Sequence, residues 1–327
     1  MIGFNSLGAA VLDAEAEEII KTSEIEGILL NKDDVRSSVA RCLGIEINSA
    51  TRDHYIDGIV NVLMDAVQNC NEPLTHDKLF LWHKALFPMG VSDGYPINVG
   101  IYRQSAEPMQ VVSGAMGKEK IHYQAPPSED LQQMMDELLS WANKEDNTDN
   151  VIKSAIVHLW FVSVHPFDDG NGRIARTLTD VFLARADGLP HRFYSMSSEI
   201  LKQRKMYYAI LERTQKSNSD ITGWLEWFLQ CLANAINNGK DVVMKVIDKT
   251  RFWERNKEKV FNERQIRMIN MLFEDFYGVL NTSKWAKINK CSQDTALRDI
   301  NDLVKKGILQ KSSSSGRSTS YTLQENI

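Results

Sequence analysis

The stretch of sequence that decides the fold is His165-Pro166-Phe167-Asp168-Asp169-Gly170-Asn171-Gly172-Arg173-Ile174-Ala175-Arg176. On both sides of it apolar residues recur every three or four positions, which predicts helices over Val151–Val164 and Arg173–Ala186. Because the residue before a proline disfavours helical backbone, the first helix should end at or before His165. The imidazole of His165 is therefore expected at a helix end.

The glycines of this loop suit the binding of an anion. Gly170 and Gly172 permit left-handed backbone and close approach, and Asn171 tolerates the same conformation. Successive backbone N–H groups can then converge at the start of the second helix, where the helix dipole adds partial positive charge. The pattern predicts a phosphate site.

Charged side chains complete the predicted phosphate site. Arg173 and Arg176 are three residues apart, so they share one helix face, where two guanidinium groups can grip phosphate oxygens. Asp169 supplies a carboxylate suited to Mg²⁺, which takes one or two protein carboxylates and completes its shell from phosphates and water. The chain has no G-x-x-x-x-G-K-[ST] motif, so an ordinary P-loop is not expected.

The loop resembles the signature of the Fic family, H-x-F-x-[DE]-G-N-G-R-x-x-R, and matches it at every specified position. The resemblance implies the Fic fold and a nucleotide site. His165 would be the catalytic general base for a target hydroxyl, and Asp169 would hold Mg²⁺ across the α and β phosphates of ATP. The resemblance assigns the ATP-binding loop to Phe167, Gly170, Asn171, Gly172, Arg173 and Arg176.

Within that loop the resemblance assigns separate roles. Gly170, Asn171 and Gly172 would donate to the phosphates. Arg173 would bind the β-phosphate and Arg176 the γ-phosphate. Phe167 would be buried and anchor the loop from beneath, whereas Asp168 occupies the variable position and receives no role.

A second segment, Thr22-Ser23-Glu24-Ile25-Glu26-Gly27, resembles the inhibitory helix of Fic proteins, [ST]-x-x-x-E-[GN]. Taken alone it reads equally as a helix end with Gly27 as a kink or cap. With the loop motif, it implies that the Glu26 carboxylate pairs with Arg176 and blocks the position of the γ-phosphate, so that the default state is off. The chain begins close to this helix, which leaves an abbreviated N-terminus as an expectation.

Two further groups of residues resemble parts of Fic proteins. Gly100–Arg103 and Met109–Gly114 are similar to the β-hairpin flap that aligns a target segment by main-chain pairing; a structural hairpin without that role is the alternative. The target-binding residues would be Met109, Gln110, Val111, Val112, Ser113 and Gly114. Tyr207, Tyr208 and Gln215 fall where Fic proteins line the adenosine pocket, although two adjacent tyrosines in a helix can equally be core. His158 is expected to be a core histidine rather than a metal ligand.

Composition limits the classes of partner. The chain has 327 residues, 38 basic and 43 acidic, and the formal charge of -5 argues against a surface adapted globally to nucleic acid or anionic lipid. No apolar run is long enough to span a membrane, and no basic segment precedes an apolar one at the start, so a cytoplasmic protein without membrane contact is expected. The four cysteines are scattered and are expected to be free thiols.

Helical periodicity dominates the chain, so we predict a mainly α fold: a Fic helical bundle with a β-hairpin flap and a small C-terminal winged helix-turn-helix domain. The other helices predicted in the first part of the chain are Ala14–Leu30, His54–Asn69, Thr75–Leu86, Ser128–Ala142, Ser198–Arg213 and Ile221–Ile236. A short hairpin is expected within Val91–Pro127. The predicted domains are residues 1–74 with the inhibitory helix, 75–240 as the catalytic core, 241–260 as a charged helical connector and 261–327 as the winged helix.

The C-terminal prediction comprises helices over Asn262–Tyr277, Thr282–Ile288 and Ser292–Lys306, with Thr282 and Ser292 as N-caps, followed by two strands around SSSSGR. From Asn281 onward there are eight basic and four acidic residues, which permits DNA contact. The acidic residues on the expected recognition helix, Asp294, Asp299 and Asp302, oppose it. A module that docks a protein is the alternative.

Together these features predict a protein adenylyltransferase that uses ATP and Mg²⁺ to attach AMP to a Ser, Thr or Tyr hydroxyl of a protein, including possible self-modification, under autoinhibition by Glu26. One alternative is a Fic enzyme that transfers another phosphate-linked group or removes AMP by hydrolysis. The other is a winged-helix DNA-binding regulator whose Fic body senses nucleotide; intact His165 and Arg176 favour catalysis instead. A homodimer is possible, and the target is not encoded in these patterns.

Overall fold

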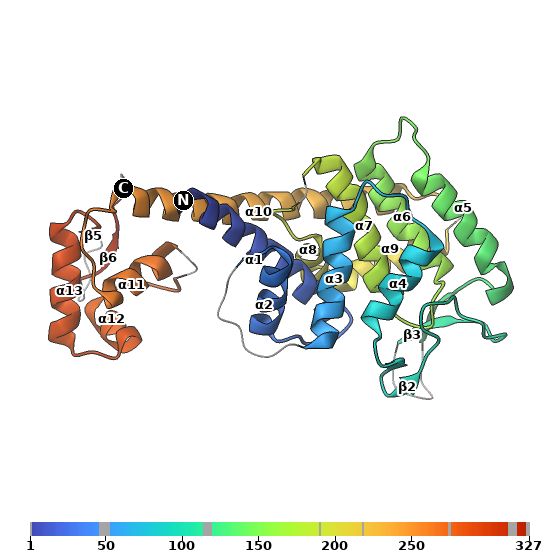
Figure 1. Cartoon of the computed structure of the whole chain (residues 1–327), viewed down its shortest axis with the longest axis horizontal. Helices are drawn as coiled ribbons and strands as arrows, with labels where there is room; N and C mark the ends of the chain where they lie inside the picture. The colour runs from blue at the N-terminus through green and yellow to red at the C-terminus, as the bar shows by residue number, and fades with distance from the viewer. Residues whose placement is uncertain are drawn as a thin grey trace. The chain divides into compact units, whose positions relative to one another are not determined.

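The computed structural model describes residues 2–45, 53–113, 120–189, 191–217, 219–273, 276–312 and 319–324. The chain forms two compact units: residues 8–240, and residues 1–7 together with 241–327. Both are mainly helical, which confirms the predicted fold class (Figure 1).

The larger unit is a helical bundle. Its helices are α1 (Ile2–Ile25), α2 (Lys32–Cys42), α3 (His54–Gln68), α4 (His76–Leu86), α5 (Leu131–Asn143), α6 (Asn150–Val164), α7 (Asn171–Asp187), α8 (Met196–Lys202), α9 (Arg204–Gln215) and the first part of α10 (Thr222–Arg255). A single 3₁₀ turn, Ser128–Asp130, precedes α5.

The α6 and α7 helices form the centre of this bundle. They pack along each other, α3 and α4 contact α7, and α5 contacts α6. In α7 every residue of 171–184 except Gly172 is buried, because apolar side chains such as Leu178 and Phe182 are surrounded by neighbouring helices. The first turn of α7, which carries the predicted phosphate site, is therefore fixed by the core.

Two predicted helices differ from the structure, and one helix was not predicted. The helix Ala14–Leu30 is wrong at its end, because α1 stops at Ile25. The single helix Ser198–Arg213 is two, α8 and α9, separated at Gln203. The short α2 was missed because its sequence opens with Lys-Asp-Asp; the side chain of Asn31 caps it, and few apolar residues mark its period.

The strands occur in two hairpins at one end of the bundle. The first pairs β1 (Val91–Ser92) with β2 (Tyr95–Pro96), and the second pairs β3 (Gln110–Ser113) with β4 (Lys120–Gln124). A hairpin within residues 91–127 is thus confirmed. The assignment of Gly100–Arg103 to a strand is wrong, and Gly114, predicted in the flap, lies outside the described residues.

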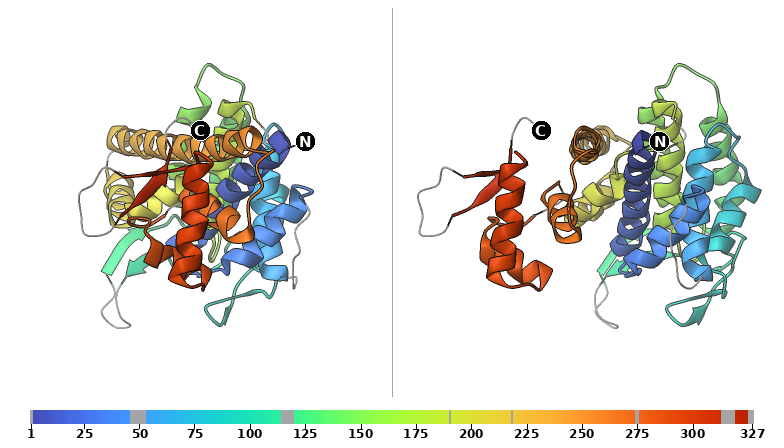
Figure 2. Two further views of the ribbon diagram at one scale, coloured as in Figure 1. Left: turned by 90° about the vertical axis from the view of Figure 1, so that its left-hand side faces the viewer. Right: turned by 60° about the vertical axis from the view of Figure 1, so that its left-hand side comes forward.

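The smaller unit contains the last part of α10 and α11 (Glu263–Phe273), α12 (Thr282–Asn289) and α13 (Gln293–Lys305), followed by β5 (Leu309–Lys311) and β6 (Tyr321–Leu323). The strands β5 and β6 lie side by side next to α13 (Figure 2). Trp285, Ile300 and Tyr321 are among the side chains that fill the core between these elements.

Two details of this unit correct the predictions. The first helix ends at Phe273, so Tyr277 is outside it and is 94% exposed. Asn281, not Thr282, caps α12 by accepting from the Lys284 amide, because Thr282 is already the first helical residue. Ser292 caps α13 as predicted.

Two expectations concern the whole chain. Cys42, Cys70, Cys231 and Cys291 are all free thiols, as predicted. Within the described ranges, no helix combines the length and apolar character needed to cross a membrane.

Candidate active site

His165 lies where α6 ends and has left-handed backbone, with φ of 51°. This conformation costs a residue other than glycine roughly 1–2 kcal/mol. Pro166 disfavours helical backbone at His165, while the amide of His165 still donates to Phe161 O at 2.9 Å. The turn ends the helix at the predicted position and presents the imidazole at the wall of a cavity.

The imidazole of His165 is held in one protonation state. Its Nδ1 lies 3.2 Å from Val162 O, and a carbonyl can only accept, so Nδ1 carries the proton. Burial lowers the pKa of His165, against the opposing effect of the Val162 bond. The ring is therefore neutral near pH 7, with a lone pair on Nε2 that can accept a proton.

Asn171 closes the loop between α6 and α7. Its Oδ1 accepts from Phe167 N at 3.0 Å, and its Nδ2 donates to Phe167 O at 2.8 Å. Gly170 is left-handed, with φ of 79°, and a Cβ atom there would lie 2.8 Å from the Phe87 ring. The first amides of α7 have no carbonyl acceptor within the helix, so this folded loop leaves them able to bind an anion.

Arg103 holds the loop in place through hydrogen bonds to main-chain carbonyls, a role that the sequence did not indicate. It is only 2% exposed and donates through Nε to His165 O at 2.9 Å and through Nη2 to Pro126 O at 2.5 Å. Its own amide donates to Pro166 O at 2.9 Å. The segment 100–103 therefore positions His165, although it forms no strand.

His83 is a second bracing residue without a sequence signal. Its ring stacks on Phe167 with centroids 4.2 Å apart, its Nδ1 accepts from Gly100 N at 3.0 Å, and its Nε2 lies 3.1 Å from Asp169 O. Burial lowers the pKa of His83 to about 4, so the neutral ring can accept on one side and donate on the other. Phe167 is fully buried beneath the loop, as the resemblance implied, and does not line the cavity.

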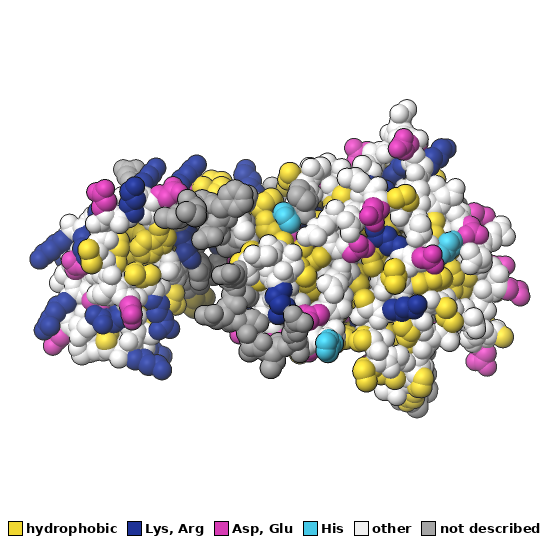
Figure 3. Space-filling view, viewed as in Figure 1, with side chains coloured by type: hydrophobic (Ala, Val, Ile, Leu, Met, Phe, Trp, Pro, Cys, Tyr) yellow, Lys and Arg dark blue, Asp and Glu magenta, His cyan; other side chains and the backbone are white. Residues whose placement is uncertain are grey.

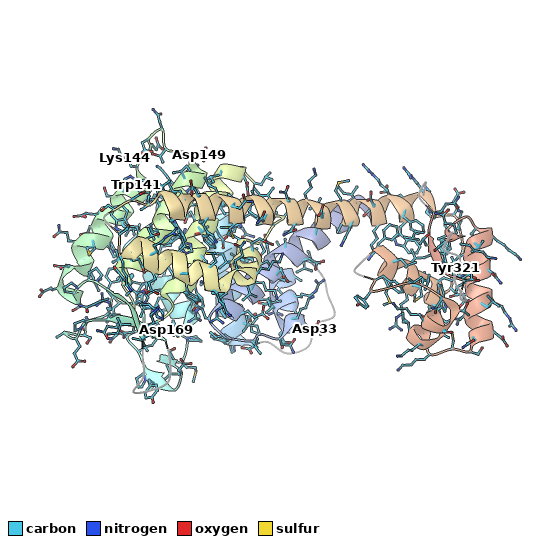
Figure 4. All side chains as sticks on the ribbon, turned by 180° about the vertical axis from the view of Figure 1, so that it is seen from behind. Asp33, Trp141, Lys144, Asp149, Asp169 and Tyr321 are labelled. Atoms are coloured by element: carbon cyan, nitrogen blue, oxygen red, sulfur yellow. The ribbon has the colours of Figure 1, made fainter. Side chains whose placement is uncertain are left out.

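Asp169 presents a partly exposed carboxylate beside the first turn of α7. Its Oδ1 accepts from Gly170 N at 2.5 Å, its Oδ2 accepts from Ser92 Oγ and lies 3.8 Å from Arg173 Nη2, and its side chain is 45% exposed. Asp169, which is labelled in Figure 4, lies at the end of the larger unit where the two hairpins are found. Asp168 has a structural contact instead, because its Oδ2 accepts from both nitrogens of Asn98.

The two arginines of the loop are buried cations. Arg173 is 4% exposed, with its guanidinium over the Phe87 ring at 4.6 Å and its Nη1 3.5 Å from Tyr55 OH. Arg176 is 3% exposed. Within the described part of the chain, neither Arg173 Nε nor Arg176 Nη1 has a hydrogen-bond partner. Buried unpaired donors are costly, so both guanidinium groups retain capacity to bind phosphate oxygens.

The Glu26 carboxylate already accepts a hydrogen bond from one of these two guanidinium groups. Its Oε1 accepts from Arg176 Nη2 at 2.6 Å, while Thr22 accepts from Arg176 through Oγ1 at 2.6 Å and through its carbonyl at 3.0 Å. The Glu26 side chain is 31% exposed and lines the same cavity as His165. It also lies close to Gly172, where a Cβ atom would meet Glu26 Oε1.

The position of Glu26 is fixed by the end of α1. Ile28 N donates to Ser23 O, and Gly27 N donates to Glu24 O, both at 3.0 Å. Gly27 is left-handed, with φ of 84°. These two bonds form a Schellman motif, so Glu26 is the C-cap residue and Gly27 the glycine that follows it.

The hairpin of β3 and β4 and the helix α9 form the other walls of the cavity, whose volume is about 770 Å³. Tyr123 of β4 donates to Ser163 O at 2.8 Å, and His122 Nδ1 lies 2.6 Å from Glu212 Oε2 of α9. The cavity is lined by the predicted residues Glu26, Met109, Gln110, Val111, Val112, His165, Asp169, Asn171, Gly172, Tyr207, Tyr208 and Gln215. Of the described site residues, Phe167, Gly170, Arg173 and Arg176 do not line it, and the side chain of Ser113 lies outside what the structure describes.

The three residues predicted at the adenosine end differ in exposure. Tyr207 is 1% exposed, and its hydroxyl bonds to His158 Nε2 at 2.9 Å. Tyr208 is 40% exposed, and Gln215 donates to Ser163 Oγ at 3.2 Å. His158 is fully buried and also bonds to Thr179, which confirms it as a core histidine.

Buried carboxylates fasten α1 to the bundle above the loop. The carboxylate of Glu18, which is 4% exposed, accepts from Ser195 Oγ at 2.7 Å and from both the amide and the hydroxyl of Ser197. Arg192 forms a buried ion pair with Asp180 of α7. The helix that ends at Glu26 is thus tied by polar contacts to α8 and packs above α7.

Glu15, one turn before Glu18, makes the stability of this arrangement depend on pH. It is 3% exposed, and burial raises its pKa to about 8, against the opposing charge of Arg192. Folding therefore favours the protonated acid, and this contribution is complete below the unfolded pKa of 4.5 and is lost as the pH rises through 8. We expect the thermal midpoint to fall over this range, and Glu15→Gln to raise stability at pH 8.5 by on the order of 2 kcal/mol.

Thermal unfolding of the parent and Glu15→Gln between pH 5 and pH 8.5 tests this expectation. Glu129→Gln, at an exposed position, is the control for removal of one charge. Parallel pH curves for the parent and Glu15→Gln would contradict the role of the buried acid.

Comparison with known proteins agrees with this geometry. Residues 73–183 match the model of the Fic/DOC family, and residues 1–45 match a model described as a domain of unknown function, DUF4172. A uridine 5'-monophosphate transferase of Xanthomonas campestris is 29% identical over 45% of this chain and 28% of its own length. A protein adenylyltransferase Fic of Nematostella vectensis is 25% identical over 70% of this chain and 49% of its own length.

The chain thus spans half or less of the length of these curated relatives. Among solved structures, a Fic family protein of Desulfovibrio desulfuricans G20 has a TM-score of 0.51 at 19% identity, over 98% of this chain and 88% of that one. That likeness concerns the fold alone.

Proposed function

The chain carries a Fic domain, and on this basis we propose that it transfers a nucleotidyl group, AMP from ATP, to a hydroxyl side chain of a protein and is held inactive by Glu26. The observation that carries the proposal is that Glu26, which lines a cavity together with His165, forms a 2.6 Å ion pair with the buried Arg176 behind it. Relatives named protein adenylyltransferase support the class of reaction.

His165 acts as the general base in this proposal. Its Nε2 takes the proton of the target hydroxyl as the hydroxyl oxygen forms a bond to the α-phosphorus and the bond to the departing pyrophosphate breaks. The bond from Nδ1 to Val162 O supports this role, because it fixes the tautomer with the lone pair on Nε2. The lowered pKa of His165 keeps that lone pair available near pH 7.

The phosphates are held by the first turn of α7 and the two arginines. The amides of Asn171 and Gly172 donate to phosphate oxygens, and that of Gly170 does so once it exchanges its bond to Asp169 Oδ1. Arg173 binds the β-phosphate and Arg176 the γ-phosphate. The unpaired donors Arg173 Nε and Arg176 Nη1 fit such a ligand. The residues also fit Mg²⁺, since the single exposed carboxylate of Asp169 suffices for an ion that draws its other ligands from phosphate and water; bound there, the ion would neutralise phosphate charge.

A target segment pairs with the hairpin of β3 and β4 in this proposal. The strand β3 contributes Gln110, Val111 and Val112 to the cavity wall, Met109 lies just before it, and the side chain of Val112 is 48% exposed. An extended peptide added beside such a strand gains main-chain hydrogen bonds whatever its sequence. Its hydroxyl would then be aligned beside His165.

Transfer of a different nucleotide is the main alternative, because one relative is named a uridine 5'-monophosphate transferase. Two polar groups at the adenosine end are not free to distinguish one base from another. The Tyr207 hydroxyl is already bonded to His158, and the Gln215 amide is bonded to Ser163. Hydrolytic removal of AMP, with Glu26 positioning water, is the other alternative.

The experiment that tests the proposal incubates the parent and Glu26→Gly with a cell lysate and each of the four α-labelled nucleoside triphosphates. We expect labelled proteins chiefly with ATP and chiefly with the variant, and the mass of the attached group identifies AMP. Labelling with UTP alone would show that the transferred group is UMP and not AMP. If no protein is labelled and AMP is released from a pre-modified protein, the reaction is removal of AMP and not its addition.

Asp169→Ala should remove the dependence on Mg²⁺ together with activity. The reason is that Asp169 supplies the exposed carboxylate beside the phosphate-binding turn, and its loss leaves that turn without an anionic metal ligand. Metal titrations of initial rate, made in the Glu26→Gly background, measure the effect. The control is Asp136→Ala, an exposed carboxylate on α5. Unaltered titration curves for Asp169→Ala would count against the assignment.

A further inference from the structure

The outer face of α13 carries a set of polar and basic side chains that the proposed transfer reaction does not use. Ala296, Asp299, Ile300 and Leu303 are buried and form the inner face of the helix. The exposed positions fall on the opposite arc. They are Gln293, Asp294, Leu297, Arg298, Asn301 and Lys305.

Two acidic residues of α13 that would oppose an anionic partner are engaged by other residues of this unit. Asp299 is 6% exposed and is bonded to Arg264 at 2.7 Å and to Asn262 at 2.8 Å. Asp302 is bonded to Gln265 at 2.8 Å and pairs with Lys306. Their charges are compensated within the unit, although the Asp302 side chain remains 46% exposed; Asp294 is the other carboxylate on the outer side of α13.

The elements beside α13 add basic residues. Lys287 and Lys290 are exposed on and after α12, which a turn of three residues joins to α13, and Lys311 is exposed on β5. Residues 241–327 contain sixteen basic and eleven acidic residues, whereas the whole chain has a charge of -5. Figure 3 shows Lys and Arg side chains over the body formed by α11 to α13.

We propose that this face binds double-stranded DNA. A helix joined by a short turn to the helix before it, with a β-hairpin behind, has the dimensions and order of a helix-turn-helix that inserts its second helix into the major groove. Arg298 and Asn301 are the side-chain types that read guanine and adenine edges, and Leu297 can contact a thymine methyl. Lys287, Lys290 and Lys311 contact the phosphates on either side of the groove.

The charge of the face is what selects this partner over a protein. The two carboxylates of this surface, one of them paired with Lys306, are outnumbered by its cations, so the surface complements a polyanion. Duplex DNA presents regularly spaced negative charge along its grooves. This inference goes beyond the transfer reaction and does not depend on it, since none of these residues lies in the catalytic unit.

The test uses the full chain and a randomised duplex of about 30 bp, long enough for more than one half-site. Bound duplexes are selected at about 50 mM salt and enriched, and affinity is then measured by fluorescence anisotropy for the enriched and the starting pools across a salt series. We expect Arg298→Ala to weaken binding to the enriched duplex by about tenfold and to the starting pool by less. Lys287→Ala should weaken both equally and lower the salt slope by about 1.

Arg267→Ala is the matched control, because Arg267 is exposed on α11 and removal of its charge should leave affinity unchanged. All the substituted side chains are exposed, and circular dichroism checks that each variant is folded. Binding that is absent at low salt, that is equal for an RNA duplex, or that falls as much in Arg267→Ala as in Arg298→Ala would overturn the proposal. Capture of a protein partner without DNA binding would overturn it as well.

Discussion

His165→Ala should lower the rate of nucleotidyl transfer by about 10²–10⁴-fold, the usual contribution of a general base. The substitution removes the imidazole, whose bond from Nδ1 to Val162 O leaves the lone pair on Nε2. It should leave the loop folded, because the contacts of Arg103 and of the Asn171 side chain use main-chain atoms. Nucleotide binding should be largely retained, since the imidazole is not needed to hold phosphate.

The measurement is the initial rate of AMP incorporation in the Glu26→Gly background, together with nucleotide affinity by calorimetry. His54→Ala, at an exposed position at the start of α3, is the control. Because the pKa of His165 is lowered, the parent rate should decline only below the pH at which an ordinary histidine is protonated. Transfer by His165→Ala at a rate near that of the parent would contradict the assignment of the base.

Local patterns made the central loop predictable. The proline after His165, the two glycines and the spacing of the arginines each act within a few residues. The helix end at Val164 could therefore be located from sequence, and the next helix, predicted from Arg173, begins two residues earlier at Asn171. The same holds for Ser292, whose side chain caps the helix that follows it. Where a single residue determines a turn or a cap, the position of that turn or cap can be predicted from the sequence alone.

Residues that act at a distance left no such signal. Arg103 contacts His165 across 62 positions, and His83 contacts Asp169 across 86. Both look like ordinary residues of a loop and a helix until the chain is folded. The pairing of Gln110–Ser113 with Lys120–Gln124 was missed for a related reason, because strand partners depend on packing against Ser163 and Glu212, not on β propensity.

The polar contacts of α1 place the helix of the proposed inhibitory residue within the core. Glu18 is held by Ser195 and Ser197, and Glu15 is buried as an acid, so the helix that ends at Glu26 is not a loosely attached lid. Under the proposed autoinhibition, relief would involve a local change at the C-cap of α1, where Glu26 is partly exposed, more readily than detachment of the helix.

Glu26→Gly should raise transfer activity at least several-fold, corresponding to on the order of 1 kcal/mol. The Glu26 carboxylate occupies Arg176 Nη2, the donor proposed to hold the γ-phosphate, so its removal frees that donor without disturbing Thr22, which binds the same guanidinium through Oγ1 and its carbonyl. Glu26→Gln is the matched control, because it keeps the side chain but removes the charge, and it should give a smaller gain.

Arg176→Ala should abolish the benefit of Glu26→Gly, because both substitutions act on one contact and cannot be additive. Initial rates of AMP incorporation at saturating Mg-ATP, for the parent, the two single variants and the double variant, measure the coupling. A glutamate that served as a base would produce the opposite sign, a loss of rate on substitution. Equal or lower activity in Glu26→Gly would therefore refute autoinhibition and favour the hydrolytic reaction, in which Glu26 itself positions water.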